Sequence, residues 1–425
     1  MKRFIIGTAD TAPERAIPPS GSRRPSTNLG PALMLALGLL ALGLLPAAGA
    51  LAVDSATPAP PLGLPPVPIP ADNPQTPEKI ALGERLFNDK RFSATGEIGC
   101  VSCHDPSKAF SDSPKPVSEG INALRGTRNA PTVVNAAYYA SQFWDGREPT
   151  LEAQSRQPFV NPVEGGLADH GPILDIVRND PDYVKALNEV FGVAPEQITM
   201  EHVSKAIASF ERTLIAGDSP FDRFYFGGDE DAMTPQQIRG LSVFLVEGRC
   251  NSCHVIEQDQ ALFTDNRFHN IGVGINAVQD EVPRLAQAFL QAKNAGADVD
   301  ATVLTDPKSS ELGRFAVTND ISRVGAFKTP TLRNIALTAP YMHDGSLATL
   351  EEVVMHYDNG GHLDDVEANP YLSGGIRPLG LTAQQEQDLV AFMKALTSPQ
   401  YAALVEQTPP AAQSSAAVDQ PEANR

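Results

Sequence analysis

The pattern Cys-x-x-Cys-His, which occurs twice, constrains this chain more than any other feature. It spans residues 100–104 and 250–254, and the two copies contain all four cysteines of the 425-residue sequence. In this pattern the two thiols form thioethers with the vinyl groups of a haem, and the histidine offers its imidazole to the iron. The sequence therefore predicts two covalently attached haem c groups. The attachment residues are Cys100, Cys103, His104, Cys250, Cys253 and His254.

Redox-active or zinc-binding cysteine pairs are the main alternative to haem attachment. In both copies the histidine directly follows the second cysteine. A tetrahedral zinc site fits this spacing poorly, so haem attachment is the preferred interpretation.

The amino-terminal segment predicts export, which agrees with haem c being attached outside the cytoplasm. Basic residues precede an apolar run over 31–45, and small residues follow it. This order is typical of a signal peptide, which we place at 1–52. We therefore expect a periplasmic protein. Because the apolar run is short for a membrane span, the protein would meet a membrane only if this segment remained uncleaved as an anchor.

The formal net charge of -18 argues against nucleic acid as a partner. A strongly acidic surface can steer a basic redox protein towards its docking site. It can also simply keep an exported protein soluble. The charge alone does not distinguish these two interpretations.

The rest of the chain predicts a mainly α fold with two tandem cytochrome c-like helical domains, each carrying one covalent haem c. Thr-Pro pairs at 76–77 and 234–235 predict the starts of helices that run towards the two haem motifs. Phe-Ser-Asp at 110–112 and Phe-Thr-Asp at 263–265 follow the two motifs in turn. Amphipathic helices are expected to end each half, over 202–214 and 382–396. The second of these begins with a capping box formed by Thr382 and Gln385.

The predicted domain boundaries follow from this repeat. A proline-rich segment, with nine prolines in positions 58–77, predicts a stiff tether without packed structure over 53–77. The two haem domains are placed at 78–228 and 229–398, with the boundary near Gly227-Gly228, and a disordered tail at 399–425. Residues 276–303 are expected to form an inserted helical excursion, with a solvent-capped surface helix preferred over a role in partner docking.

Four short motifs lie between the two haem motifs, at 128–132, 143–147, 151–154 and 161–164. On these motifs the chain resembles the bacterial di-haem cytochrome c peroxidases and their relative MauG, over roughly residues 76–396. The resemblance implies that the first haem is the peroxide site. It places Glu164 and Gln154 on the distal side of that haem, and Trp144 between the two haems as an electron relay.

These assignments agree with the chemistry of peroxide cleavage. The inner oxygen of peroxide must lose a proton and the outer oxygen must gain one, and a carboxylate such as Glu164 can carry out both transfers. The amide of Gln154 can hold peroxide by hydrogen bonds. Without the resemblance, Glu164 would be interpreted as a helix-start or solvent-exposed carboxylate, and Trp144 as core filling.

The chain departs from the conventional peroxidases at the first haem. In that family a histidine sixteen residues after the proximal histidine often closes the iron, but here the position is Gly120, and no histidine occurs between His104 and His170. This departure resembles MauG. It implies a first haem that is open to ligands without prior activation.

The second haem also departs from the conventional pattern. Lys328 to Asn334, Thr338 to Gly345 and Leu350 to Gly361 resemble the same family, in which a methionine seven residues after the leucine binds the second iron. That position is Tyr357, as in MauG. A phenolate would stabilise oxidised iron relative to methionine. Because Met355 and His356 are neighbours, Met355 in particular remains an alternative ligand.

The resemblance further implies a calcium ion bound by Asn129, Thr338 and Pro340. It also matches His343 to a family position near the haems. The other histidines have no pattern around them, and structural or exposed roles are expected for His170, His202, His269 and His362.

Three functions are compatible with these features. The first is a peroxidase that reduces hydrogen peroxide with electrons from a small cytochrome c or cupredoxin. The second is a MauG-like oxidase that withdraws electrons from a protein substrate. The third is a non-enzymatic di-haem electron-transfer or redox-sensing cytochrome. Glu164, Gln154 and Gly120 argue against the third function, whereas Tyr357 and Gly120 favour the second.

Overall fold

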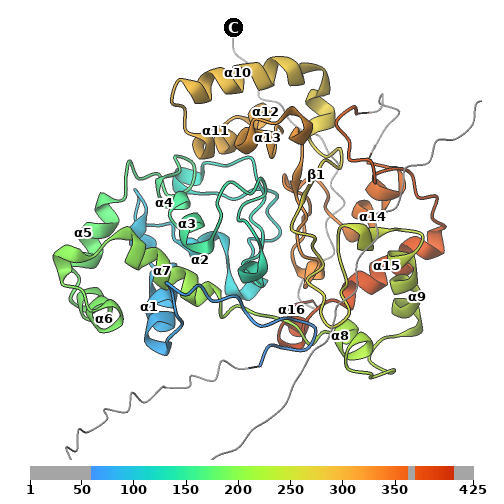
Figure 1. Cartoon of the computed structure of the whole chain (residues 1–425), viewed down its shortest axis with the longest axis horizontal. Helices are drawn as coiled ribbons and strands as arrows, with labels where there is room; N and C mark the ends of the chain where they lie inside the picture. The colour runs from blue at the N-terminus through green and yellow to red at the C-terminus, as the bar shows by residue number, and fades with distance from the viewer. Residues whose placement is uncertain (1–58, 362–368, 406–425) are drawn as a thin grey trace, which may run out of the picture. The chain divides into compact units, whose positions relative to one another are not determined.

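Helices dominate the part of the chain that the structure describes, which confirms the mainly α prediction (Figure 1). The computed structural model describes residues 59–361 and 369–405, so the predicted signal peptide at 1–52 and His362 lie outside the described residues. The helices of the amino-terminal half are α1 (Pro77–Asn88), α2 (Cys100–Cys103), α3 (Leu151–Gln154), α4 (Gln157–Val160), α5 (Gly171–Asn179), α6 (Pro181–Phe191) and α7 (Met200–Glu211). Those of the carboxy-terminal half are α8 (Pro220–Tyr225), α9 (Pro235–Leu245), α10 (Val282–Asn294), α11 (Val299–Thr305), α12 (Pro307–Ser310), α13 (Phe315–Thr318), α14 (Leu350–Asp358), α15 (Ala383–Lys394) and α16 (Ala402–Val405). A small sheet pairs β1 (Phe268–His269) with β2 (Phe327–Lys328) in antiparallel orientation, with Phe268 opposite Lys328.

Threonines begin the helices at the predicted positions. The Oγ1 atom of Thr76 accepts a hydrogen bond from the N–H of Lys79 at 3.2 Å, at the start of α1. Thr234 Oγ1 accepts one from the N–H of Gln237 at 3.3 Å, at the start of α9. Proline follows each of these threonines and fits the first turn because that position needs no N–H donor. Thr382 begins α15 with the predicted capping box.

In each half two long helices pack on each other, α1 on α7 and α9 on α15 (Figure 1). A Cβ atom at Gly83 in α1 would lie 1.9 Å from the carbonyl oxygen of Ala206 in α7. A Cβ at Gly240 in α9 would lie 1.9 Å from the carbonyl oxygen of Asp388 in α15. In both pairs the two backbones are therefore too close for any side chain at the glycine.

The repeat extends into the loops, where the sequence analysis does not detect it. Asn135 and Asn334 both adopt left-handed backbone conformations, with φ of 65° and 60°. The N–H of Asn135 donates to the carbonyl of Leu214 at 2.8 Å, and the N–H of Asn334 donates to that of Leu396 at 3.0 Å. Each asparagine thus anchors its loop to the chain just after α7 or α15, the second helix of the packed pair in its half.

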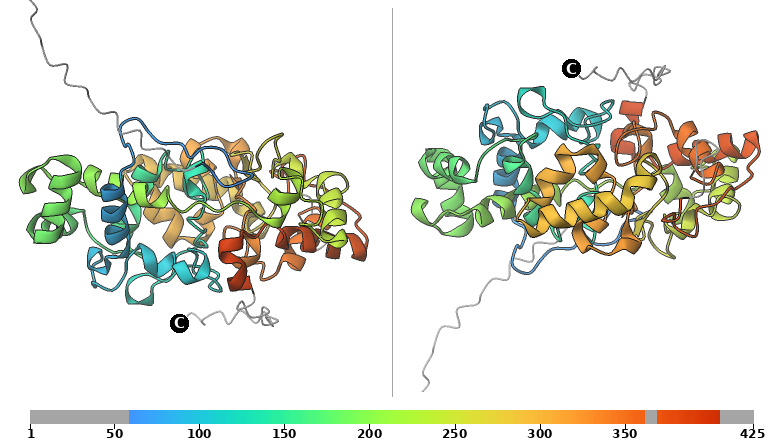
Figure 2. Two further views of the ribbon diagram at one scale, coloured as in Figure 1. Left: turned by 90° about the horizontal axis from the view of Figure 1, so that it is seen from below. Right: turned by 90° about the horizontal axis from the view of Figure 1, so that it is seen from above.

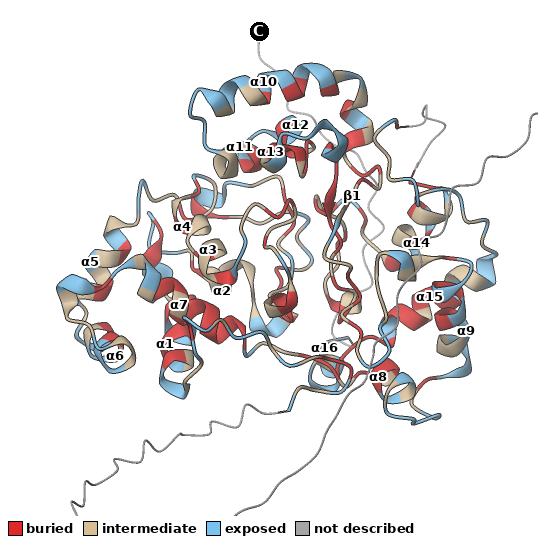
Figure 3. Ribbon diagram, in the orientation of Figure 1, coloured by how far each residue is buried: buried red, intermediate tan, exposed pale blue. Residues whose placement is uncertain are grey.

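Three groups of buried apolar residues form the interior (Figure 3). One lies among α1, α5, α6 and α7, another among α8, α9, α14 and α15, and a third among α10, α11 and α13. The second core includes the fully buried Phe221 of α8, whose ring packs against Phe263 and Phe392. It therefore begins before the domain boundary predicted at Gly227-Gly228.

The proline-rich segment is packed rather than a free tether over its described part, 59–76. Leu64 is buried, and the carbonyl of Gly63 accepts a hydrogen bond from Arg333 Nη2 at 2.8 Å in the carboxy-terminal half. The carbonyl of Pro65 accepts one from the hydroxyl of Tyr138 at 2.9 Å in the amino-terminal half. Prolines remove N–H donors but leave carbonyl acceptors, so an extended proline-rich strand can still be held by donors from both halves.

The segment 276–303, predicted as an inserted helical excursion, contains the surface helix α10 (Figures 2 and 3). One face of α10 is buried, including Phe289, and the other face is exposed to solvent. A solvent-capped surface helix is nevertheless an incomplete description. The helices α11 to α13 follow α10 and form a core with it. The Thr127 hydroxyl of the amino-terminal half donates to the carbonyl of Val303 in α11 at 2.6 Å. The excursion therefore reaches the half that carries the first haem motif.

The tail predicted to be disordered over 399–425 begins with ordered structure. Residues Pro399–Tyr401 form a 3₁₀ turn and α16 follows, while the remainder lies outside the described residues. Within 59–361 and 369–405, we find no helix with the length and apolar character that a membrane span requires. The apolar run over 31–45 is not among these residues.

Candidate functional site

A large cavity in the amino-terminal half brings the first haem motif together with the predicted distal residues. Its empty space, including the open mouth, measures about 1500 Å³. Its wall is built by α2, the turn 143–147, α3, the loop 164–165 and part of the segment 328–330. The predicted site residues that line it are Cys100, Cys103, His104, Asn129, Trp144, Gln154 and Glu164.

The first motif fits covalent haem attachment. Cys100 and Cys103 are free thiols at the ends of the single-turn helix α2. The Nδ1 atom of His104 lies 3.3 Å from the carbonyl oxygen of Phe110, which leaves Nε2 as the nitrogen available to a metal. Burial lowers the pKa of the His104 imidazole to about 4, so the ring is neutral at neutral pH, as a metal ligand has to be.

The second motif repeats this arrangement. Cys250 and Cys253 are free thiols, and His254 Nδ1 lies 2.9 Å from the carbonyl oxygen of Phe263. Burial again lowers the pKa of the imidazole. Phe110 and Phe263 are the first residues of the two Phe-Ser/Thr-Asp motifs, so these motifs supply the carbonyl that orients each histidine.

Tyr357 in α14 is partly buried close to both cysteines of the second motif, and desolvation raises the pKa of its hydroxyl above the usual range. Its neighbour Met355 is 46% exposed to solvent. His356 is buried, with Nε2 2.9 Å from the carbonyl oxygen of Ile271. Of the three residues considered from the sequence, Tyr357 therefore has the surroundings expected of a ligand to the second haem.

Glu164 is partly buried in the first cavity, with its carboxyl Oε2 atom shielded from solvent. Within the described residues, its Oε2 atom has no hydrogen-bond partner. Burial raises the pKa of Glu164 to about 7, with a further contribution from the negative charge of Asp300. A carboxyl group with this pKa can both accept and donate a proton near neutral pH.

Gly120 packs against the backbone of the Glu164 loop. A Cβ atom at Gly120 would lie 2.2 Å from the carbonyl oxygen of Val163 and 2.5 Å from the Cα of Glu164. The N–H of Ile121 donates to the carbonyl of Glu164 at 2.9 Å. A histidine at position 120 would require this loop to move, so backbone packing explains the glycine.

Trp144 connects the first cavity to the second haem motif. Its indole N–H donates to the carbonyl of Asn129 at 2.9 Å, and its own carbonyl accepts from the N–H of Lys328 at 2.7 Å. Two residues further on, Pro330 lines the first cavity and presents its carbonyl to the ring of His254. A short continuous path thus runs from the Trp144 backbone to the second proximal histidine.

Five titratable residues of the cavity wall are not predicted as site residues from the sequence: Arg128, Tyr139, Arg147, Glu211 and Lys328. Lys328 places Nζ 3.6 Å from the ring centroid of Tyr139, and burial lowers the pKa of Lys328 to about 7. Glu211, at the end of α7, is buried, and its pKa is raised to about 8 by desolvation. Nothing local marks Tyr139 or Glu211, since Glu211 lies in the amphipathic helix predicted over 202–214 and Tyr139 lies between the motifs at 128–132 and 143–147.

The side chains of the remaining described histidines contact protein groups. His343 Nε2 lies 2.9 Å from the Glu311 carboxylate, and the His343 ring stacks on Phe327. The sequence His343-Asp344-Gly345 repeats the positions of Trp144-Asp145-Gly146. The other described histidines each have a partner, His170 at the carbonyl of Arg156, His202 at the N–H of Thr199 and His269 at the carboxylate of Asp265.

The residues predicted to bind calcium lie on two connected loops. The backbone N–H of Asn129 donates to the carbonyl of His343 at 2.8 Å, and the Asn129 amide donates to the carbonyl of Pro116 at 3.1 Å. Thr338 and Pro340 belong to the same loop as His343. Calcium binding by these residues remains a prediction.

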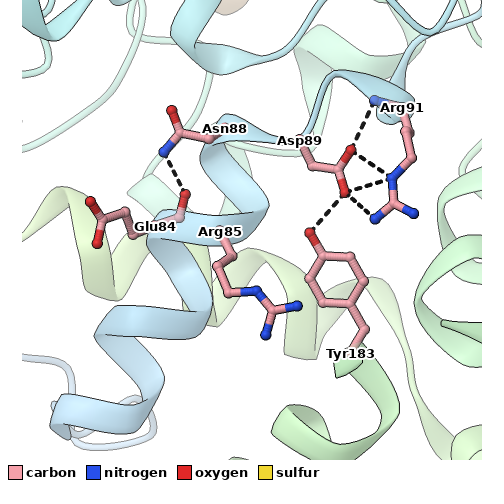
Figure 4. Close-up of a pocket in the computed structure, with 6 residues that line it drawn as sticks. All are labelled: Glu84, Arg85, Asn88, Asp89, Arg91 and Tyr183. Atoms are coloured by element: carbon pink, nitrogen blue, oxygen red, sulfur yellow. Dashed lines mark hydrogen bonds and ion pairs between the residues drawn. The ribbon is translucent and has the colours of Figure 1, made fainter. Parts of the chain in front are cut away.

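A second, shallow pocket lies at the end of α1 and beside α6 (Figure 4). The Asp89 carboxylate accepts hydrogen bonds from Arg91 and from the Tyr183 hydroxyl, the latter at 2.8 Å. The polar groups at its centre thus bind each other. None of the residues that the sequence predicts as site residues lines this pocket.

Sequence comparisons find relatives over most of the chain. A family profile described as "Di-haem cytochrome c peroxidase" matches residues 77–231. Cytochrome-c peroxidase IdrP1 of Denitromonas iodatirespirans is 38% identical, and the match covers 80% of this chain and 86% of that protein. Methylamine utilization protein MauG of Methylorubrum extorquens is 36% identical, with 81% of this chain and 85% of that protein covered.

A comparison with solved structures agrees with these matches. A MauG-like protein associated with microbial copper homeostasis has 33% sequence identity and a TM-score of 0.64. The match covers 81% of this chain and 95% of the other. Peroxidases and MauG proteins are thus similar to this chain at nearly the same level of identity.

Proposed function

Because the chain belongs to the di-haem cytochrome c peroxidase and MauG family, we propose that it is a periplasmic oxidoreductase that reacts with hydrogen peroxide in its first cavity. Family membership implies two tandem cytochrome c-like domains with two haem c groups. His104 and His254 are the proximal ligands in this proposal, and the four cysteines hold the haems covalently.

The buried carboxyl of Glu164 is the observation that best supports this function. It lines the same cavity as His104 and Gln154, its Oε2 has no partner among the described residues, and its pKa is raised to about 7. Desolvating a carboxyl group without satisfying it costs free energy. A pure electron carrier would have no use for such a group, whereas peroxide chemistry requires a proton acceptor and donor.

In this proposal Glu164, Gln154 and Trp144 have separate roles in the reaction with peroxide. When bound, the first haem supplies the iron that takes peroxide and the electrons that reduce it. The Glu164 carboxylate accepts the proton of the inner peroxide oxygen and returns it to the outer oxygen, so that water can leave. The Gln154 amide orients peroxide by hydrogen bonds without competing for its proton. Trp144 and the segment 328–330 provide the route by which electrons from the second site reach the first.

The source of the electrons separates two versions of this function. A conventional peroxidase would take them from a small cytochrome c or cupredoxin, and a MauG-like enzyme from a protein substrate. The close packing of Gly120 on the Glu164 loop and the position of Tyr357 beside the cysteines of the second motif favour the MauG-like version. The acidic surface would suit a basic redox partner in either case. Calcium at Asn129, Thr338 and Pro340 would stabilise the connection between the two loops.

Steady-state turnover of hydrogen peroxide by the diferric protein, with reduced cytochrome c as donor, tests the function. We expect peroxide to react with the fully oxidised protein without a preceding one-electron reduction. Rapid oxidation of the cytochrome would support the conventional peroxidase. Peroxide consumption with slow cytochrome oxidation would support the MauG-like version. If the protein consumes no peroxide in either oxidation state, the non-enzymatic cytochrome replaces both.

Changing Tyr357 to Phe should alter the second haem only. Because the substitution removes the phenolate oxygen and keeps the ring, we expect the low-spin ferric signal in electron paramagnetic resonance to change while the high-spin signal of the first haem stays the same. Met355→Leu is the matched control, since Met355 is largely exposed. If the low-spin signal responds to Met355→Leu and not to Tyr357→Phe, methionine is the ligand.

A further inference from the structure

Asp300 in α11 connects two elements of the first cavity that are far from it in sequence. Its Oδ1 accepts a hydrogen bond from Arg147 Nε at 2.6 Å, and its Oδ2 accepts one from the Asn161 amide at 2.6 Å. The Asp300 side chain is only 11% exposed and that of Arg147 only 7%. Because an ionised carboxylate makes strong hydrogen bonds, Asp300 holds the side chains of Arg147 and Asn161 in a fixed position relative to each other.

The two partners of Asp300 each belong to a functional element. Arg147 ends the turn that begins with Phe143 and contains Trp144, and its guanidinium lies 3.6 Å from the ring centroid of Phe143. Asn161 organises the loop of Glu164, because its carbonyl accepts from the N–H of Glu164 at 3.2 Å. A displacement of Asp300 would therefore release both the turn and the loop.

We propose that Asp300 is a positioning residue of the peroxide site, which ties the Trp144 turn to the Glu164 loop and shields Glu164 from the positive charge of Arg147. The inserted excursion is then a part of the first site that the carboxy-terminal half contributes. This inference deepens the proposed function and rests on it for the role of Glu164.

The charges around Glu164 explain why this shielding matters. Arg147 is the positive charge that acts on Glu164, and Asp300 is the negative charge that opposes it. The other counter-charge of Arg147 is Asp145, at 3.0 Å, but Asp145 also faces Arg128 at 3.8 Å. Without Asp300 the guanidinium would be less compensated, and ionised Glu164 would be favoured.

Other titratable groups near Glu164 leave this argument unchanged. Cys100 and Cys103 also interact with it electrostatically, but these thiols become uncharged thioethers when haem is attached. Apart from Arg147, and from His104, which would bind the haem iron, the further titratable residues on the cavity wall are Arg128, Tyr139, Glu211 and Lys328. None of these four contributes a main electrostatic influence on Glu164.

The test is the pH at which Glu164 ionises in the holoprotein with Asp300 changed to Asn. We expect the midpoint to fall by about one unit from its wild-type value, because the substitution removes a negative charge next to Arg147. Infrared difference spectroscopy of the protonated carboxyl band reports this midpoint without any turnover, and Glu164→Gln identifies the band. Cyanide binding to the first haem across the same pH range is the second measurement, and its pH dependence should shift in the same direction.

Asp280→Asn provides the control, since Asp280 is exposed on the same excursion and the substitution makes the same charge change. Its midpoint should equal that of the wild type. Asp300→Ser leaves room for water beside Arg147 and carries the same expectation if the asparagine variant does not fold. An unchanged midpoint in the folded Asp300 variants would overturn the inference. A shifted midpoint in a protein that consumes no peroxide would support the inference on Asp300 and reject the proposed function.

Discussion

Changing Glu164 to Gln slows the reaction of the diferric protein with hydrogen peroxide by about 100-fold or more, while both haems remain attached. This is the usual effect of losing a positioned acid-base group. The glutamine keeps the size and polarity of the side chain but cannot accept the peroxide proton. Stopped-flow mixing with peroxide measures the rate, and the absorbance of the haems confirms their content.

The pH dependence of the same reaction gives an independent check. Burial raises the pKa of Glu164 to about 7, so the group is protonated below this pH and becomes a base above it. The rate in the wild type should therefore rise as the pH increases through about 7, and this step should be absent in Glu164→Gln. Glu97→Gln is the control, because Glu97 is an exposed carboxylate close in sequence to the first motif. A wild-type rate in Glu164→Gln would remove Glu164 from the mechanism.

Changing Cys250 and Cys253 together to Ala removes one haem and abolishes turnover with an electron donor. The intact mass of the wild type should exceed that of the processed polypeptide by two haem units, and that of the variant by one. Because the first motif is unchanged, the variant should still bind cyanide at its remaining haem. Peroxide turnover should fall to background, since electrons no longer enter through the second site.

The complementary variant makes this prediction specific. Changing Cys100 and Cys103 to Ala should also remove one haem, but it should remove the cyanide-binding haem and leave the low-spin one. If instead the wild-type mass shows bound zinc or four free thiols, the haem interpretation of both motifs is wrong.

Local sequence patterns determined the two haem motifs, the helix starts and the family. Thr76 and Thr234 begin helices because their hydroxyl groups cap the first turn, an interaction that spans only three residues. The phenylalanine after each motif orients its histidine through a backbone carbonyl only six to nine residues away. Because both partners of such an interaction lie within a few residues of each other, a short stretch of sequence is enough to predict it.

Contacts between residues far apart in the sequence determined features that the local sequence patterns did not predict. The segment 59–76 looks like a free tether because its prolines suggest a stiff extended chain, yet its carbonyl groups meet donors from both halves, more than seventy residues away. The loop repeat at Asn135 and Asn334 has a short signature, Pro-Thr-x-x-Asn-x-Ala at 131–137 and 330–336, but only the structure shows the left-handed asparagine and the backbone hydrogen bond that the two loops share.

Asp300 is a residue of the first site whose contacts could not be predicted from the sequence. It lies in the seven-residue helix α11, where an acidic residue in the first turn is most simply a helix-stabilising surface charge. Only the fold brings it within hydrogen-bond distance of Arg147 and Asn161, which are 153 and 139 residues away in sequence. The sequence determined which groups the first site contains, and the tertiary structure decided which charges surround Glu164, because electrostatic interactions depend on distance in space and on burial.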